Sequence, residues 1–163
     1  MSNAILLVDT GNLYHNVFRR YPHQRINYSK LLQVIPEEYS LLSKTAYGAY
    51  RYNNTKALAF ITALSRLNFV TKFERLESNK YYNPTVDMVL EAVTRSKDVD
   101  CVIFASTNPY LIPVVHWLKQ RNISSCIIGC NISRDFCLSA SKIIEINEAY
   151  LVEDKNEVDN SEK

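Results

Sequence analysis

The sequence predicts an α/β domain built on a mostly parallel central sheet. Apolar runs of strand length alternate with helix-like patterns along the whole chain. The run CVIFA at 101–105 is continuously apolar, which is typical of a strand covered on both faces. With 163 residues, 47% of them apolar, the chain is long enough to form one domain with a substantial core.

The first half of the chain alternates strand and helix patterns. The apolar run at 4–8 predicts a buried strand, and a helical pattern follows at 12–19. The next elements are a helix at 28–35 ended by Pro36, a Tyr-rich strand at 44–52, a helix at 55–67 and a strand at 69–76.

The second half repeats the alternation. Pro84 suits the first turn of a helix that carries residues 86–93. After the strand at 101–105, Asn108 and Pro109 form a helix-starting pair ahead of YLIPVVHWLKQR. The last elements are a strand at 124–129, a short helix near 134–141 and a strand at 142–146.

Charge divides the chain into a basic body and an acidic end. Residues 148–163 carry six acidic residues against two lysines and are predicted to be a flexible C-terminal tail. Residues 1–147, the predicted domain, keep seventeen basic against eleven acidic residues, although the whole chain has a net charge of only +2. A basic body suits a polyanion-binding domain and equally suits an ordinary solvated surface.

Neither a membrane segment nor a disulfide framework is predicted. The longest uncharged run, 101–118, contains Asn108, Pro109 and Pro113, so a strand, a turn and a helix fit it better than a membrane span. No targeting signal precedes the first strand, and we expect a cytoplasmic protein. The cysteines are interpreted as reduced, buried thiols on strands rather than as a disulfide or metal site; they are Cys101, Cys126, Cys130 and Cys137.

Asp9, Thr10 and Gly11 follow the first apolar run, and an Asp-Thr-Gly turn is what an aspartic protease shows at its catalytic site. Such a protease needs two of these carboxylates sharing a proton on an all-β framework. Here there is one copy, and it leads straight into a helical pattern. We therefore reject the protease and favour a metal-dependent nuclease, in which a strand also delivers an Asp to a short turn. Asp9 is also a suitable N-cap for the helix that follows.

Four segments in order carry a resemblance to a known family. They are ILLVDTGNLY, TVDMVL, CVIFASTNPYLIPVVHWLKQRNI and CIIG. This series resembles the NYN family of the PIN-like ribonuclease superfamily over residues 4 to about 146. The resemblance implies a Rossmann-like, PIN-like three-layer sandwich with an acidic pocket that binds Mg²⁺ or Mn²⁺ and hydrolyses RNA phosphodiesters.

The resemblance assigns roles to particular residues. Asp9 corresponds to the family's first catalytic carboxylate, and Asn12 to the polar residue that orients the site. Asp87 corresponds to the acid on the helix before the fourth strand, so Asp9 and Asp87 are the expected metal ligands. Asn108 stands at a catalytic position in the turn after the fourth strand.

The chain departs from the family pattern in that same turn. The family usually reads Ser-Gly-Asp-x-Asp, whereas this chain has Asn108 and Tyr110 where the two acids belong. A later Ala-Asp is changed to Ala140-Ser141. The loss of two or more negative charges is expected to weaken metal binding, since carboxylates offset the dehydration of the ion. Glu91, one turn beyond Asp87, is interpreted as a surface residue rather than as a replacement ligand.

Tyrosines and basic residues are interleaved in the middle of the chain. The whole chain has eleven tyrosines, which is a high count for this length. Aromatic rings beside cations suit single-stranded RNA, because bases stack on the rings while Lys and Arg contact phosphates. Tyrosines also line covered sheet faces as ordinary strand residues. Arg51, Tyr52 and Lys80 are the predicted RNA contacts, because turns and element ends reach the site.

The leading hypothesis from the sequence is a metal-dependent ribonuclease with a partly eroded acidic site. The alternative is a catalytically inactive relative that binds RNA or a protein partner through the same surface. A third hypothesis is a structural subunit of a larger assembly, in which the pocket is vestigial and the tyrosines contact protein. The expected partner is RNA, and a protein partner or a homo-oligomer is left open. The nuclease lineage requires Asp9 and Asp87 to meet at one rim of the parallel sheet.

Overall fold

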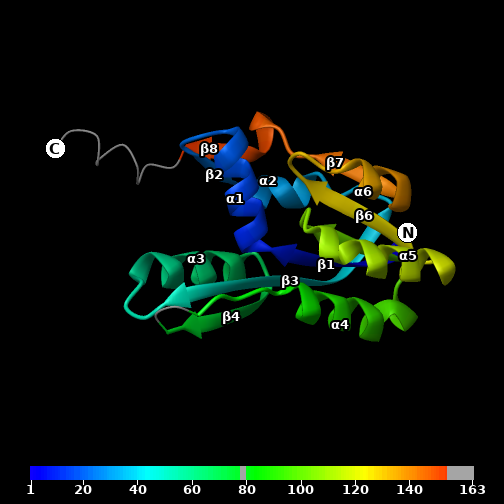
Figure 1. The fold of residues 1–163 in the computed structure, drawn as a ribbon, viewed down its shortest axis with the longest axis horizontal. Helices are drawn as coiled ribbons and strands as arrows, with labels where there is room; N and C mark the ends of the chain where they lie inside the picture. The colour runs from blue at the N-terminus through cyan, green and yellow to red at the C-terminus, as the bar shows by residue number, and fades with distance from the viewer. Residues whose placement is uncertain (78–79, 154–163) are drawn as a thin grey trace.

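Six parallel strands form the central sheet, in the order β4-β3-β1-β5-β6-β7 (Figure 1). The structure, a computed structural model, describes residues 1–77 and 80–153. The strands are β1 Ser2–Asp9, β3 Tyr39–Arg51, β4 Val70–Leu76, β5 Cys101–Ala105, β6 Ser124–Gly129 and β7 Lys142–Glu145.

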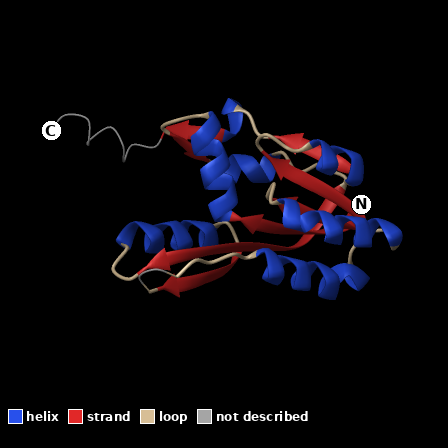
Figure 2. Ribbon diagram, in the orientation of Figure 1, coloured by secondary structure: helices blue, strands red, loops and turns tan. Residues whose placement is uncertain are grey.

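Helices cover both faces of this sheet, as the ribbon in Figure 2 shows. The helices whose buried side chains pack on one face are α1 Thr10–Arg20, α2 Tyr28–Gln33 and α3 Thr55–Arg66. Those on the other face are α4 Thr85–Arg95, α5 Ile112–Gln120 and α6 Arg134–Ser139. The predicted three-layer α/β architecture is confirmed, and double coverage explains why β1 and β5 are nearly continuous apolar runs.

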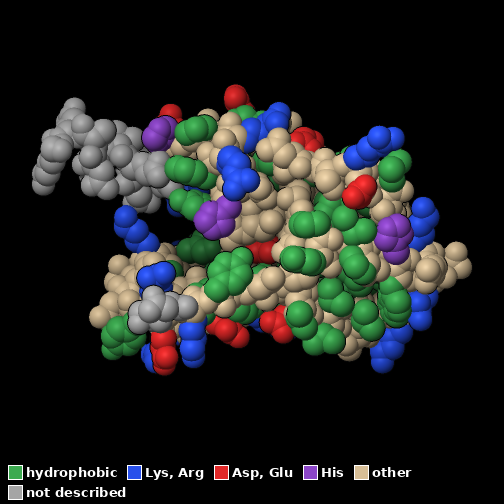
Figure 3. All heavy atoms as spheres, in the orientation of Figure 1, with side chains coloured by type: hydrophobic (Ala, Val, Ile, Leu, Met, Phe, Trp, Pro, Cys, Tyr) green, Lys and Arg blue, Asp and Glu red, His purple; other side chains and the backbone are tan. Residues whose placement is uncertain are grey.

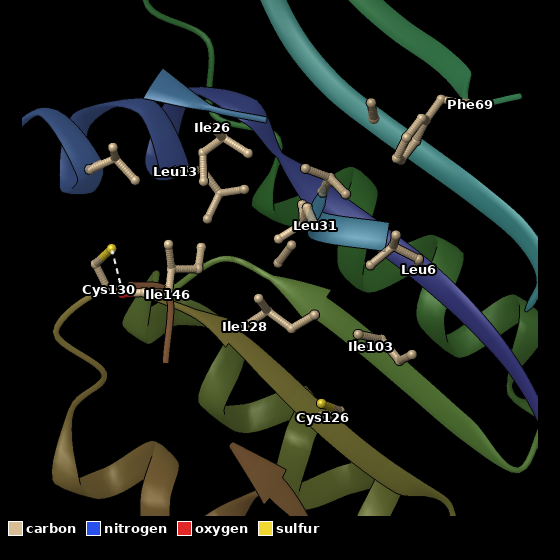
Figure 4. Packing of buried hydrophobic residues seen from close by; sticks show 14 of the residues in the cluster. Leu6, Leu13, Ile26, Leu31, Phe69, Ile103, Cys126, Ile128, Cys130 and Ile146 are labelled. Carbon is tan, nitrogen blue, oxygen red and sulfur yellow. Dashed lines mark hydrogen bonds between the residues drawn. The ribbon is translucent and has the colours of Figure 1, made fainter. Parts of the chain in front are cut away.

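Alternation along β1 divides the core into two layers. Leu6 faces α1 and α2, where it packs with Leu13, Leu31 and Ile103 (Figure 4). Ile5 and its neighbours on the opposite side pack against α4 and α5. β1 pairs with β3 on one side and with β5 on the other, so it lies at the centre of the sheet.

Because all six strands are parallel, their carboxyl ends lie at one edge. Helices that follow these strands begin at this edge and run back across the faces of the sheet, so their N-termini lie at the same edge. This edge, called the carboxyl edge below, collects Asp9 from β1 and the first turns of α1 and α4. Polar residues that are far apart in the sequence are thereby brought together.

Folded structure continues past residue 147, where the predicted domain ends. Residues 148–153 belong to the folded body, as the 3₁₀ turn η3 (Glu148–Tyr150) and the strand β8 (Leu151–Glu153). β8 pairs antiparallel with β2 (Gln24–Ile26), and Leu151 is buried in the core beside α1. Burial of Leu151 explains why this acidic stretch folds onto the domain. The rest of the predicted tail, 154–163, lies outside the described residues.

The four cysteines are all free thiols. Cys101, Cys126 and Cys130 are buried, as expected, but Cys137 is exposed on α6, which corrects the prediction that all four are buried on strands. Within the described ranges, no helix has both the length and the apolar character needed to cross a bilayer.

Gly48 on β3 permits a close approach of three elements. A Cβ atom at this position would lie 2.6 Å from Thr10 Oγ1 and still closer to the ring of Phe73 on β4. We expect Gly48→Ala to lower the free energy of unfolding by about 1–3 kcal/mol, because a well-packed contact must shift to accept the methyl group. Urea denaturation followed by circular dichroism measures this change.

Gly11→Ala is the matched control. The nearest atom to its added methyl group would be Asp9 Oδ1 at 3.7 Å, an ordinary contact. Gly11 lies in α1, where alanine is the better helix former, so the control is expected to keep or raise stability. Equal stability of Gly48→Ala and wild type would contradict the packing argument.

Candidate functional site

Asp9 ends β1 and begins α1. Its Oδ1 accepts a hydrogen bond from the backbone N–H of Asn12 at 3.0 Å, so the side chain is the N-cap of the helix. Asp9 is only 5% exposed. Burial raises the pKa of this carboxyl group above its usual value, and backbone hydrogen bonds from Asn12 and Gly11 only partly offset that effect.

Asn12 joins the start of α1 to the end of β5. Its Oδ1 accepts the backbone N–H of Thr107 at 2.9 Å and the side-chain amide of Asn16 at 3.1 Å. The Asn16 amide also donates to Thr107 Oγ1 at 2.9 Å. The carbonyl oxygen of Asn12 is therefore already used within the fold.

Asn108 joins the end of β5 to the start of α4. Its Oδ1 accepts the backbone N–H of Tyr110 at 3.1 Å and so caps the 3₁₀ turn η2 (Pro109–Leu111). Its amide Nδ2 donates to Thr85 Oγ1 at 2.9 Å, and the Thr85 hydroxyl in turn donates to Asn83 Oδ1 at 2.6 Å. A continuous set of neutral amides and hydroxyls thus follows the turn after β5, where the family pattern has acids.

Asp87 lies in the first turn of α4 and is exposed. The hydroxyl of Tyr82 donates a long hydrogen bond of 3.4 Å to its Oδ2. Burial, together with the negative charges of Asp87, Glu74 and Asp9, raises the pKa of the Tyr82 phenol to about 12. The negative charges of Asp9 and Asp87, the two carboxylates predicted to meet at one rim, therefore both act on Tyr82.

Glu91 is not the surface residue expected from the sequence. Its carboxylate accepts hydrogen bonds from Thr45 Oγ1 at 2.7 Å, from the Tyr47 hydroxyl and from Lys72 Nζ at 2.8 Å. Burial alone would raise its pKa, but these three donors outweigh burial and lower it. Glu91 is held as an anion that joins α4 to β3 and β4, and its oxygens are engaged by those donors.

The residues at this edge do not fit a metal held by a cluster of acids. Across residues 1–77 and 80–153, no group of three or more His, Cys, Asp or Glu side chains could hold an ion. The carbonyl oxygens of Asn12 and Asn108, which are potential ligands, each accept a backbone N–H instead. Of the predicted site residues, only Asp9 and Asp87 could offer a charged oxygen ligand to a metal.

The predicted RNA contacts lie at the ends of β3 and β4. Arg51 and Tyr52 line a groove of about 340 Å³ together with Arg75. The Arg75 guanidinium lies 5.3 Å from the centre of the Tyr52 ring, and Tyr52 is 70% exposed. Lys80 pairs instead with Glu77 at 3.7 Å, beside the same groove. In Figure 3 the surface is hollowed between α1 and α3 at the carboxyl edge, with acidic side-chain surface at the inner end of the hollow.

Three further residues, Asn16, Thr85 and Asn83, belong to this site although the sequence did not single them out. Asn16 stands four residues after Asn12 in a helical pattern, so a shared helix face was a usable signal. Thr85 and Asn83 carry no such signal, because their link to Asn108 joins two elements that are distant in the chain.

Comparisons with known proteins agree on the fold. The family model described as the NYN domain matches residues 3–147. A crystal structure of a protein of unknown function from Vibrio parahaemolyticus superposes with a TM-score of 0.83 at 23% sequence identity, and the match covers 93% of this chain and 96% of that one. This level of identity shows a shared fold alone. No curated protein matches the sequence.

Replacing the buried carboxylate of Asp9 tests its energetic role. Its pKa is raised above 3.8 in the folded chain. Ionisation of Asp9 therefore lowers the free energy of unfolding progressively as the pH rises from 3.8, and the full loss is reached above the pKa of the folded state. Asp9→Asn keeps a capping oxygen and removes the charge. We expect the free energy of unfolding at neutral pH to rise, because the charge no longer has to be buried. The gain should disappear well below pH 3.8, where the carboxyl group is neutral in both states.

Denaturation at a series of pH values measures this effect, and Asp9→Ala is the control. Alanine removes the cap as well as the charge, and loss of a cap costs about 1 kcal/mol. If Asp9→Asn lowers stability at neutral pH as much as Asp9→Ala does, burial of the charge is not the main energetic effect of Asp9.

Proposed function

Because the chain belongs to the NYN domain family, we propose that it binds single-stranded RNA at the carboxyl edge without hydrolysing it through an acid-held metal. Domains of this family have a nuclease-like fold and generally act on RNA. What separates this chain from a metal-dependent ribonuclease is the chemistry of its own edge residues.

The observation that carries the proposal is the neutral hydrogen-bond network after β5. Thr107 and Asn108 use their polar groups to join β5 to α1 and α4. Mg²⁺ is bound through oxygen ligands at about 2.0–2.1 Å in near-ideal octahedral geometry, and carboxylates supply the charge that replaces its hydration. These amide oxygens supply no charge, and each already accepts a hydrogen bond within the fold.

The groove at the ends of β3 and β4 supports RNA binding. Arg51 and Arg75 bring positive charge to it, and Tyr52 offers an exposed ring. A base stacking on such a ring contributes roughly 1–3 kcal/mol, and the guanidinium groups can contact the backbone phosphates. Since every base has a stacking face, this chemistry favours single strands and shows little sequence preference.

The rival function is residual hydrolysis, and Asp9 is the residue that favours it. Mg²⁺ at phosphoryl-transfer sites often uses only one or two carboxylates, with waters and substrate phosphates as the other ligands. Asp9 and Asp87 supply that number, and the charges of both act on Tyr82. The two functions therefore differ in one measurable outcome, which is cleavage of bound RNA.

A cleavage assay decides between them. We expect the wild-type protein to leave labelled single-stranded RNA intact in Mg²⁺ and in Mn²⁺, because the acid set is incomplete. Asn108→Asp combined with Tyr110→Asp restores the two acids of the family pattern and is the variant in which metal-dependent cleavage should increase. Cleavage by the wild type that needs Mn²⁺ and is lost in Asp9→Asn would establish the rival function.

A binding assay tests the RNA interface itself. We expect Tyr52→Ala to weaken binding of a short single strand by about tenfold, since a base stacked on the ring is worth about 1–3 kcal/mol. Arg75→Ala should weaken binding as well, because a cation that contacts the backbone is lost. Arg75→Ala should also make binding less dependent on salt, because one phosphate contact is lost. Fluorescence anisotropy at several salt concentrations measures both effects.

Lys119→Ala is the matched control, since Lys119 is an exposed cation on α5 outside the groove. It should leave the affinity nearly unchanged. If the wild type shows no affinity for RNA at low salt, or if Lys119→Ala weakens binding as much as Arg75→Ala, the proposed interface is wrong.

A further inference from the structure

β4 is an edge strand whose outer side is uncovered. It pairs with β3, and within the described residues no strand lies against its other side. Backbone N–H and C=O groups along such an edge are available to another strand. Phe73 packs toward α3, so alternation places Val70, Lys72 and Glu74 on the face that α4 shares. Val70 is 54% exposed there.

The adjoining face of α4 is apolar and also exposed. Val86, Leu90 and Val93 recur at helical spacing, and Leu90 is 59% exposed. Leu90, Lys72 and Glu74 line the same groove of about 670 Å³ between α4 and β4. Parallel sheets are normally covered on both faces, so this part of the sheet lacks its cover. Figure 3 shows hydrophobic side chains gathered over α4 and α5, and acidic and basic side chains side by side along the rim at β4.

We propose that a second copy of this chain covers this surface, by antiparallel pairing of the two β4 strands about a two-fold axis at Phe73. In this register Lys72 lies opposite Glu74 of the partner subunit, and by symmetry Glu74 lies opposite the partner subunit's Lys72. Val70 lies opposite Leu76 of the partner subunit. Opposite charges and apolar pairs that face each other across strands stabilise a sheet.

The order of charges along β4 selects this register. Residues that lie directly opposite each other in an antiparallel pair of strands share one face of the sheet. Moving the axis by one residue would place Lys72 opposite the partner subunit's Lys72, or Glu74 opposite the partner subunit's Glu74, and both arrangements oppose like charges. Charged residues on an edge strand commonly prevent pairing. Here the pattern is complementary to itself, and within the described chain Glu74 has no ion-pair partner of its own, whereas Lys72 pairs with Glu91.

The helix face extends the contact beyond the strands. With the axis perpendicular to the sheet, the α4 layers of both copies lie on the same side of the joined sheet. The exposed stripe of α4 then faces its symmetry mate across the groove. Stable dimers bury about 1,200–2,000 Å² in total, more than one strand pair supplies, so this second layer is needed. The proposal does not depend on RNA binding.

Light scattering after size exclusion tests the proposal with the full chain. We expect the mass to rise from 18.8 kDa toward twice that value as the protein concentration increases. Glu74→Lys should weaken the dimer about tenfold or more, because two attractive contacts become repulsive. Lys72→Glu should do the same, but it also removes the ion pair with Glu91 inside the chain, so Glu74→Lys is the decisive variant. An equal mixture of the two variants should recover a dimer, because each variant then faces the opposite charge.

Two further measurements keep the test independent of misfolding. Lys119→Glu makes the same charge change as Lys72→Glu on exposed α5 and should leave the dimer unchanged. Hydrogen exchange of the wild type should show amides of β4 becoming better protected as concentration rises. A chain that stays monomeric, or a dimer that is insensitive to Glu74→Lys and gives β4 no added protection, would overturn the proposal.

Discussion

The hydrogen bond from the backbone N–H of Thr107 to Asn12 Oδ1 determines the geometry of the carboxyl edge. β1 and β5 are direct neighbours, paired up to Val8 and Ala105, so the turns that follow them come within reach of each other. The amide of Asn12 then fixes the two turns together. With Thr107 held in place, the next residue, Asn108, is positioned to donate to Thr85 at the start of α4. One side chain of α1 thus anchors the chain of contacts that arranges the whole edge.

Two carboxylates near this edge have opposite energetics. Glu91 accepts three hydrogen bonds and its pKa is lowered, so its ionised form supports the fold. Asp9 is buried and its pKa is raised, so its charge opposes folding at neutral pH. An asparagine would cap α1 equally well without that penalty. Functional sites commonly contain residues that lower stability. Since an asparagine would serve the fold better, the charge of Asp9 points to a role in function rather than in folding.

The sequence was sufficient for the sheet and insufficient for its cross-links. Continuous apolar runs indicated β1 and β5 correctly, because double coverage leaves a clear pattern. The strand β8 was missed, since Leu151 is a single buried anchor within an acidic stretch. Asn108 was expected as a local cap, and that role is present. Its bond to Thr85, like the partners of Glu91, joins segments that are far apart in the chain, and no local pattern reports such a contact.

The direction of the strands constrains how RNA binding and pairing of β4 would combine. Two β4 strands that pair antiparallel point in opposite directions, so the two carboxyl edges of the joined sheet face away from each other. A short RNA strand held at one edge would not reach the other, and each copy would bind its own strand. Asp9 and Asn12 lie on β1 and α1, away from the β4 edge, so the partner would not cover them. Arg75 and Leu76, which line the RNA groove, lie on β4 itself, and in the proposed register they are opposite Thr71 and Val70 of the partner subunit. Pairing of β4 is therefore expected to compete with RNA for the Arg75 end of the groove, and it would not increase the affinity of either copy.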